Sequence, residues 1–230
     1  MVTIEQSLIS VRQRIQRACA QAGRSDAAVT LLAVSKTFPA DAVRQAAAAG
    51  QSAFGENYVQ EGVSKILALR DLPLQWHCIG PIQSNKSALV AEHFDWAHTI
   101  DRLKIAQRLG QQRPAGKAPL QVCIQVNVDG GANKSGVPSE HALALARAVA
   151  DVPGLRLRGL MAIPEPAPDA QAALALCQRV AAVFEHIAQA GLPASAQWDT
   201  LSLGMSADLE AAIAAGSTLV RVGSAVFGQR

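Results

Sequence analysis

The chain of 230 residues is half apolar and only 17% charged, which is enough apolar material for a large core and argues against disorder. Its net charge of +3, from 21 basic and 18 acidic residues without a basic run, argues against binding to nucleic acid or membranes through bulk charge. The apolar stretches are too short to span a bilayer, and the amino terminus lacks the apolar core of a signal peptide.

Short β-type runs alternate with longer alanine-rich helical stretches along the whole chain. The predicted strands are Val29–Val34, Ser52–Gly55, Gln75–Ile79, Trp96–Ile100, Leu120–Val126, Leu157–Ile163, Thr200–Leu203 and Thr218–Val222. The predicted helices are Ile4–Ala22, before the first strand, and then Ala40–Ala49, Tyr58–Arg70, Asn85–Glu92, Arg102–Gln112, Ser139–Asp151, Ala170–Gly191 and Ala207–Ala215.

This alternation predicts the α/β class. Eight β/α repeats in this length close most simply into a single (β/α)8 TIM-type barrel with an extra amino-terminal helix, because the right-handed crossover rule favours one continuous winding. An open, doubly wound sheet is the structural alternative. No linker or shift in composition divides the chain, so we expect one domain over residues 1–230.

The four cysteines lie far apart in the sequence and form no C-x-x-C motif. They therefore indicate neither a disulfide framework nor a zinc site, and we expect a protein of the reducing cytoplasm. His93 and His98 flank Asp95, but no further ligand stands at metal spacing, so we expect no bound metal.

Lys36 stands where the first buried strand gives way to a loop. A free amine at such a position can condense with an aldehyde, and the commonest aldehyde held that way is pyridoxal phosphate. The alternative is a lysine whose stem packs at the strand end while its ammonium group reaches solvent.

Two segments near the carboxyl terminus have the chemistry of a phosphate-binding cup. Ser206 follows Gly204 at the predicted start of a helix, where a hydroxyl and free N–H groups can meet an anion, and Gly223 and Ser224 follow the last strand. The loops after strands seven and eight of a TIM barrel commonly bind phosphate. The alternative is that Ser206 is only a helix N-cap.

Arg221 lies within an apolar strand, where a charge needs a partner or a polar site. Beside a pyridine nitrogen, its guanidinium group would donate a hydrogen bond and keep that nitrogen unprotonated. The competing interpretation is an internal ion pair, with Glu56 as the partner.

Seven segments, in order from about Val29 to Gly228, resemble those of the pyridoxal phosphate homeostasis proteins. They are LLAVSKTFP, FGENYVQE, WHCIGPIQSNK, VNVDGGANKSGV, GLMAI, LSLGMSADLEAAIAAGST and VRVGSAVFG. Members of that family resemble the barrel domain of fold-type III enzymes such as alanine racemase, and they hold the cofactor without an established catalytic reaction. The resemblance implies a carrier or buffer for intracellular homeostasis of this vitamin B6 cofactor.

The resemblance also implies roles for individual residues. Lys36 would carry pyridoxal 5'-phosphate as a covalent aldimine, a Schiff base, and Arg221 would face the pyridine nitrogen. The implied cofactor-binding residues are Lys36, Asn57, His77, Met205, Ser206, Arg221, Gly223 and Ser224. Many relatives have threonine in place of Ser224, which keeps the hydroxyl group. The segments Gln83–Lys86 and Lys134–Gly136 resemble loops at the barrel mouth, where solvated loop lysines are an equally good interpretation.

A small amino-acid racemase that uses the same cofactor is the alternative function. Racemisation needs proton donors on both faces of the cofactor, and alanine racemases supply the second from a tyrosine whose placement depends on a carboxyl-terminal β domain. The chain ends at Arg230, directly after the eighth strand, and its only tyrosine is Tyr58, so we expect no such domain and a monomeric, non-catalytic protein. The expected partners are pyridoxal phosphate and the apo-enzymes that use it.

A barrel that acts on sugar phosphates through Lys36 is a third hypothesis. Asp199 precedes the seventh strand, on the face that stabilises a barrel rather than the catalytic one.

Overall fold

The structure, a computed structural model, describes residues 2–130, 135–193 and 195–228. Its strands are β1 (Thr30–Val34), β2 (Ala53–Glu56), β3 (Gln75–Cys78), β4 (Trp96–Ile100), β5 (Leu120–Asn127), β6 (Val137–Pro138), β7 (Leu155–Met161), β8 (Thr200–Ser202) and β9 (Leu219–Val222). Its α-helices are α1 (Ile4–Gln21), α2 (Ala40–Ala48), α3 (Val59–Ala68), α4 (Ser87–His93), α5 (Leu103–Gln112), α6 (Ser139–Ala150), α7 (Ala170–Gln189), α8 (Leu209–Ala214) and α9 (Ser224–Phe227). Two 3-10 helices cover Asp26–Ala28 and Ser84–Lys86.

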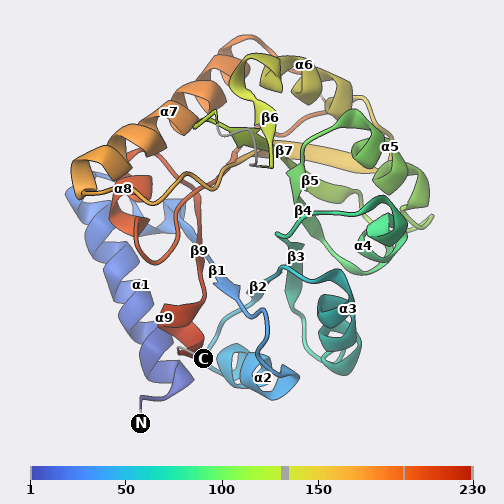
Figure 1. Cartoon of the computed structure of the whole chain (residues 1–230). Coiled ribbons are helices and arrows are strands. Elements are labelled where there is room, and N and C mark those ends of the chain that lie inside the picture. The colour runs from blue at the N-terminus through green and yellow to red at the C-terminus, as the bar shows by residue number, and fades with distance from the viewer. Residues whose placement is uncertain (1, 131–134, 194, 229–230) are drawn as a thin grey trace.

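The strands form a closed parallel barrel. Neighbouring strands follow the order β4, β3, β2, β1, β9, β8, β7 and β5, and a further pairing of β4 with β5 closes the ring. The helices form an outer ring, as the view down the barrel shows (Figure 1). The predicted (β/α)8 barrel is therefore confirmed, and the open sheet is excluded because β4 and β5 are paired. The two-residue strand β6, which the sequence did not predict, pairs with β5.

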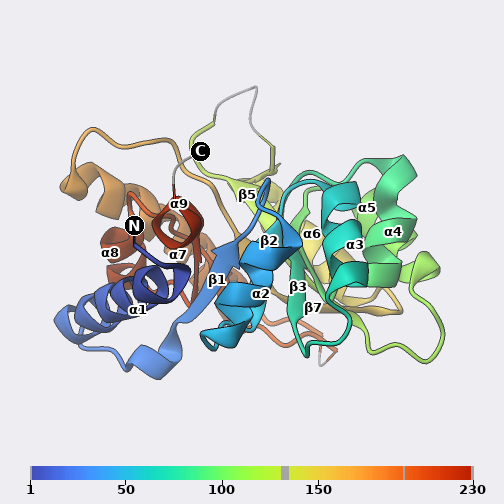
Figure 2. The ribbon, with the colours of Figure 1, turned by 90° about the horizontal axis from the view of Figure 1, so that it is seen from below.

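The register of the strands brings distant segments to one end of the barrel. β1 is hydrogen-bonded to β2 on one side and to β9 on the other, with Val34 paired to Gly55. The carboxyl ends of these three adjacent parallel strands are therefore close together. They are followed by Lys36, Asn57 and Gly223. Figure 2 shows α2 in front of β1 and β2, and α3 beside β3.

The amino-terminal helix α1 is present as predicted and has a place in the ring. Thr3 caps it, and its side chain and that of Gln6 form a reciprocal capping box. The apolar face of α1, including Leu8, Val11 and Ile15, is buried, and the helix packs against α8 and α9. The one-turn helix α9 after β9 was not predicted, because four residues are too few to give a periodic pattern.

Alternate strand residues point into the barrel or outward to the helices. Inside, Trp96, Cys123 and Met161 form one buried cluster, separate from the core between strands and helices. His77 stacks on Trp96 with the ring centroids 5.1 Å apart and the planes 11° from parallel. The interior is thus packed with side chains, and free space lies at the two ends.

Several element boundaries near the expected site differ from the prediction: β7 ends at Met161 instead of Ile163, and β8 ends at Ser202 instead of Leu203. β2 extends through Glu56, since this residue is paired with Cys78 of β3. α8 begins at Leu209 rather than at residue 207, because Asp208 is its N-cap and the Asp208 carboxylate accepts a hydrogen bond from the N–H of Met205. Within the described ranges, no helix is both long and apolar enough to cross a membrane.

Candidate functional site

A cavity of about 640 Å³ lies at the carboxyl ends of the barrel strands. Its lining residues are Val34, Lys36, Phe38, Asn57, Ile79, Ile163, Met205, Ser206, Ala207, Arg221, Gly223, Ser224 and Gly228. Seven of the eight predicted cofactor-binding residues line it, and His77 does not. The apolar lining residues Phe38, Ile79 and Ile163 were not predicted as site residues. Their sequence signal is weak, because an apolar residue at a strand end is equally typical of the core.

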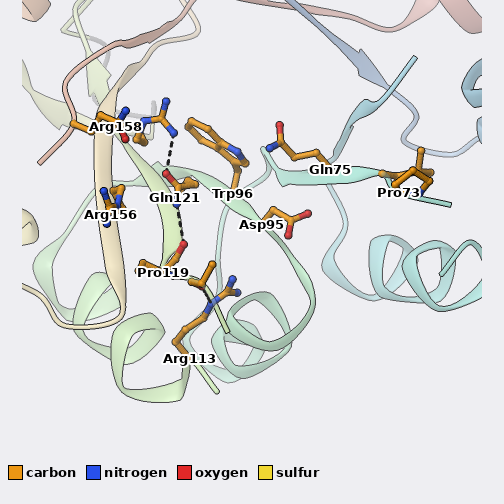
Figure 3. A pocket seen from close by; sticks show the side chains of 12 residues that line it. Pro73, Gln75, Asp95, Trp96, Arg113, Pro119, Gln121, Arg156 and Arg158 are labelled. Carbon is orange, nitrogen blue, oxygen red and sulfur yellow. Dashed lines mark hydrogen bonds between the residues drawn. The ribbon is translucent and has the colours of Figure 1, made fainter. Parts of the chain in front are cut away.

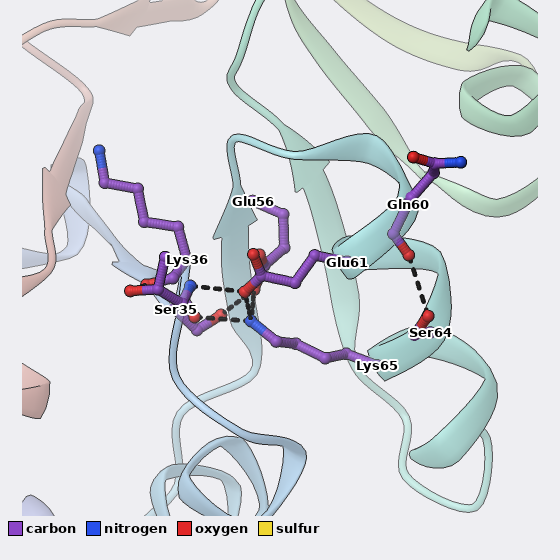
Figure 4. Close-up of polar contacts among 8 residues, drawn as sticks. Ser35, Lys36, Glu56, Gln60, Glu61, Ser64 and Lys65 are labelled. Carbon is purple, nitrogen blue, oxygen red and sulfur yellow. Dashed lines mark hydrogen bonds and ion pairs between the residues drawn. The ribbon is translucent and has the colours of Figure 1, made fainter.

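Lys36 reaches this cavity from the turn after β1. Its side chain is half-buried, and among the described residues no hydrogen-bond or ion-pair partner is present for its amine. The Lys36 side chain extends away from a charged cluster formed by Glu56, Glu61 and Lys65 (Figure 4). Hydrogen bonds from this cluster hold the backbone next to Lys36.

That charged cluster contains the partner of Glu56. The Glu56 carboxylate accepts hydrogen bonds from Lys65 Nζ at 2.8 Å and from Ser35 Oγ at 2.6 Å. Burial raises the pKa of Glu56, and its bonds with Lys65 and Ser35 act in the opposite direction. The ion pair between Arg221 and Glu56 considered from the sequence is therefore wrong, since Glu56 is paired with Lys65 instead.

Arg221 is buried in β9 and lies against the cavity wall. One of its terminal nitrogens donates to the Ser202 carbonyl and hydroxyl oxygens, each at 2.7 Å, and the other donates to the Ala162 carbonyl at 2.8 Å. Among the residues that the structure describes, these bonds use three of the five N–H donors of the guanidinium group and leave two without a partner. Burial lowers the pKa of Arg221 to about 10, so the group stays protonated at neutral pH.

His77 lies inside the barrel instead of at the cavity. Its ring nitrogens lie 2.9 Å from His98 Nε2 and 3.0 Å from Gln75 Oε1, and His98 Nδ1 lies 3.0 Å from Ser202 Oγ. Burial lowers the pKa of His77 to about 3 and that of His98 well below its usual value. The expectation that His77 lines the cavity is corrected: its ring points into the barrel interior, where His98 links it to Ser202.

The residues of the expected phosphate cup meet at one side of the cavity. Ser206 lies in the turn before α8, Gly223 is the N-cap of α9 and Ser224 is the first residue of α9. In the described part of the chain, neither serine hydroxyl has a hydrogen-bond partner. Because Asp208 caps α8, the interpretation of Ser206 as an N-cap is wrong.

Two glycines shape this side of the cavity. Gly204 has a φ of +97°, and a Cβ there would lie 2.4 Å from Ala212 Cβ, so only glycine fits the turn that leads to Ser206. A Cβ on Gly223 would lie 3.2 Å from the carbonyl oxygen of Val34, so glycine also lets the end of β9 lie against β1.

Asn57 and Met205 complete the predicted set at the cavity. Asn57 Oδ1 is buried and has no hydrogen-bond partner in the part of the chain that the structure describes. A polar group bound in the cavity could satisfy it. The Met205 side chain is partly exposed at the rim. The sole tyrosine, Tyr58, is 58% exposed and does not line the cavity.

A second cavity, of about 580 Å³, lies at the amino ends of the strands (Figure 3). Its Arg158 pairs with Asp199 at 2.7 Å, donates to Gln121 and lies over the Trp96 ring, while Arg113 donates to three main-chain carbonyls. The donors of these arginines are thus bonded within the protein. Asp199 lies at the amino end of β8, on the stabilising face of the barrel, as predicted.

The remaining sequence-based expectations concern loops and metals. Residues 84–86 form a 3-10 helix outside the cavity lining, and Lys134 lies outside the described residues. Over residues 2–130, 135–193 and 195–228, no three His, Cys, Asp or Glu side chains are grouped as a metal site.

The chain is similar to known proteins over almost its whole length. Residues 7–230 match the family described as alanine racemase, N-terminal domain. The chain is 56% identical over its full length to the pyridoxal phosphate homeostasis protein of Pseudomonas aeruginosa, covering 97% of that protein, and 54% identical to the one of Escherichia coli, covering 98%. The structure of PipY from Synechococcus elongatus with PLP bound is 34% identical with a TM-score of 0.85, and the match covers 98% of this chain and all of that one.

Proposed function

This chain belongs to the alanine racemase N-terminal-domain family and to the pyridoxal phosphate homeostasis proteins, and we propose on this basis that it binds pyridoxal 5'-phosphate in the cavity at the carboxyl ends of the strands. The observation that carries the proposal is the convergence of Lys36, Arg221 and two serine hydroxyls on one cavity. Its role would be intracellular homeostasis of the vitamin B6 cofactor.

The residues present fit this cofactor. A cavity of about 640 Å³ is within the usual range for a small-molecule site. The remaining donors of Arg221 would face the pyridine nitrogen, and Ser206, Gly223 and Ser224 would hold the phosphate. Asn57 and Met205 would border the ring. His77 would act only indirectly, through His98 and Ser202.

The chemistry at Lys36 is the formation of a covalent bond with the cofactor's aldehyde. The unprotonated amine of Lys36 attacks the aldehyde carbon, a C=N bond forms, and the aldehyde oxygen leaves as water. The protein's contribution is to hold the amine, the ring and the phosphate at fixed separations. The reverse reaction with water releases the cofactor, as a carrier requires.

We propose that the protein carries the cofactor without turning over amino acids. The exposed Tyr58 is not among the residues that line the cavity, so the chain's only tyrosine is poorly placed to act as a second proton donor. An arginine that leaves the pyridine nitrogen unprotonated weakens the ring as an electron sink, which suits binding better than elimination or transamination. Racemase activity would be weak at most.

We also propose the compartment, the recipients of the cofactor and the oligomeric state of the protein. All four cysteines are free and buried, which suits the reducing cytoplasm. The recipients of the cofactor would be apo-enzymes that depend on it, and the chain would act as a monomer.

The deciding experiment combines a visible spectrum with borohydride reduction and peptide mapping. The protein mixed with pyridoxal phosphate should turn yellow, and reduction should fix the cofactor on the peptide that contains Lys36. The Lys36→Ala variant should stay colourless. A parent protein that stays colourless, or attachment to Lys65 or Lys86 instead, would contradict the proposal.

A further inference from the structure

We propose that Glu61 and Lys65, on the first two turns of α3, are positioning residues that clamp the backbone on both sides of Lys36 and so aim its amine into the cavity. This inference rests on the proposed function, because it assumes that Lys36 bonds to the cofactor. Neither residue lines the cavity, so each would act only through the turn it holds.

The clamp on the carboxyl side of Lys36 acts on Thr37. Thr37 has a φ of +67°, in the left-handed region that a β-branched residue rarely adopts. Its N–H donates a 2.5 Å hydrogen bond to the Glu61 carboxylate. Such a conformation persists only where its surroundings hold it, and Glu61 supplies that hold.

The clamp on the amino side acts on Ser35. Lys65 Nζ donates to the Ser35 carbonyl oxygen at 2.7 Å, and the Ser35 hydroxyl donates to Glu56 at 2.6 Å. The Lys65 ammonium group also bridges the Glu56 and Glu61 carboxylates, at 2.8 and 2.6 Å. One buried ammonium group therefore joins both clamps into a single unit.

The geometry fixes the direction of the lysine between these anchors. With the backbone held before and after Lys36, the turn has little freedom to rotate. Figure 4 shows the cluster on one side of the turn and the Lys36 side chain leaving it on the other. A small change in the placement of a reacting group can reduce its rate of reaction by a large factor, so these contacts should control how fast the C=N bond forms.

Two substitutions at Glu61 separate this role from general packing. Glu61→Ala removes the acceptor for the Thr37 N–H, whereas Glu61→Gln keeps an oxygen acceptor of the same length and loses only the charge. We expect Glu61→Ala to slow the formation of the yellow species from pyridoxal phosphate by about tenfold to a hundredfold. Glu61→Gln should recover most of the parent rate. The matched control is Glu140→Ala, which removes an exposed first-turn acid from α6 and should not change the rate.

A second measurement uses pyridoxamine phosphate, which has the ring and phosphate but no aldehyde. Its dissociation constant should be the same for Glu61→Ala and the parent, since Glu61 acts only through Lys36. Equal rates for the parent and Glu61→Ala would overturn the inference. So would a loss of pyridoxamine phosphate affinity in Glu61→Ala as large as its loss of rate.

The Lys36→Ala background separates failure of this inference from failure of the proposed function. If Lys36→Ala abolishes the yellow species, the proposed bond stands, and Glu61→Ala added to it should not further weaken the binding of pyridoxal phosphate. If Lys36→Ala still turns yellow, the proposed function fails and the positioning role falls with it.

Discussion

Ser202 accepts two hydrogen bonds from one nitrogen of Arg221, one at its hydroxyl and one at its carbonyl oxygen, each 2.7 Å long. The same hydroxyl lies 3.0 Å from His98 Nδ1. The contacts are consistent if Ser202 donates to a neutral His98, which donates in turn to His77 and through it to Gln75. The cavity-facing guanidinium group is thus supported by a polar chain that runs through the barrel interior.

Replacing Ser202 with alanine should destabilise the protein. The change removes an acceptor for Arg221 and leaves His98 Nδ1 buried without a donor, so we expect a loss of about 1–3 kcal/mol in the free energy of unfolding. Urea denaturation measures it. The matched control is Ser64→Ala, which removes an exposed hydroxyl that donates to the Gln60 carbonyl (Figure 4) and should change stability little. If Ser202→Ala and the parent have equal free energies of unfolding, the hydrogen bonds of Ser202 make no net contribution to stability.

The interior histidines should make the protein less stable as the pH falls. Burial lowers the pKa of His77 from 6.5 to about 3 and that of His98 well below 6.5, so both stay neutral in the folded state. The unfolded chain gains protons below pH 6.5 that the folded chain does not. Between that pH and the folded pKa values, stability should therefore fall by up to about 1.4 kcal/mol per pH unit for each histidine.

The measurement is the unfolding free energy at several pH values from about 7.5 down to about 5.5. Burial raises the pKa of Glu56, which contributes a slope of the opposite sign above pH 4.5, so the informative quantity is the difference between variants. His77→Phe should have a smaller slope than the parent, although it is less stable throughout. The exposed His186→Phe is the control. An unchanged slope in His77→Phe would contradict the prediction.

The strand ends were the predictable part of the site. Lys36 and Arg221 are recognisable because a charge in or directly after an apolar strand needs a partner, and in a parallel barrel the carboxyl ends of the strands meet on one face. The alternation of elements placed both residues at one end of the barrel, but alternatives stayed open for each, and the full set of cofactor-binding residues came from the resemblance to the family.

The direction of a side chain at a strand end was harder to predict. His77 is two residues before Ile79, which does line the cavity, yet it lies inside the barrel. Depth along the barrel axis depends on strand tilt and stagger, which the sequence does not state. The partner of Glu56 was also missed. That partner is Lys65, which also pairs with Glu61. The i, i+4 spacing of Glu61 and Lys65 was visible in the sequence, but such spacing usually indicates an exposed pair and gave no sign of the buried contact with Glu56.

The hydroxyl groups of Ser206 and Ser224 should matter for phosphate binding. In the Lys36→Ala background, which reports non-covalent affinity, Ser206→Ala and Ser224→Ala should each weaken pyridoxal phosphate binding by about 1.5–3 kcal/mol, or roughly tenfold to a hundredfold. Binding of unphosphorylated pyridoxal should change little. The control is Ser139→Ala at the start of α6, away from the cavity. If both variants bind and discriminate like the parent, the phosphate lies elsewhere.

The carrier function predicts that amino acids are not turned over. The exposed Tyr58 is not among the cavity-lining residues, and Arg221 keeps its proton at neutral pH and so would leave the pyridine nitrogen unprotonated. The loaded protein, incubated with L-alanine in deuterium oxide, should therefore exchange the α-proton far more slowly than about one per second, an enzyme-like rate. NMR follows the exchange, and chiral chromatography detects the D-isomer. Exchange at the enzyme-like rate would make the carrier proposal wrong. If Tyr58→Phe then stopped racemisation but left exchange of the L-isomer, Tyr58 would be the second proton donor and the protein would be a racemase.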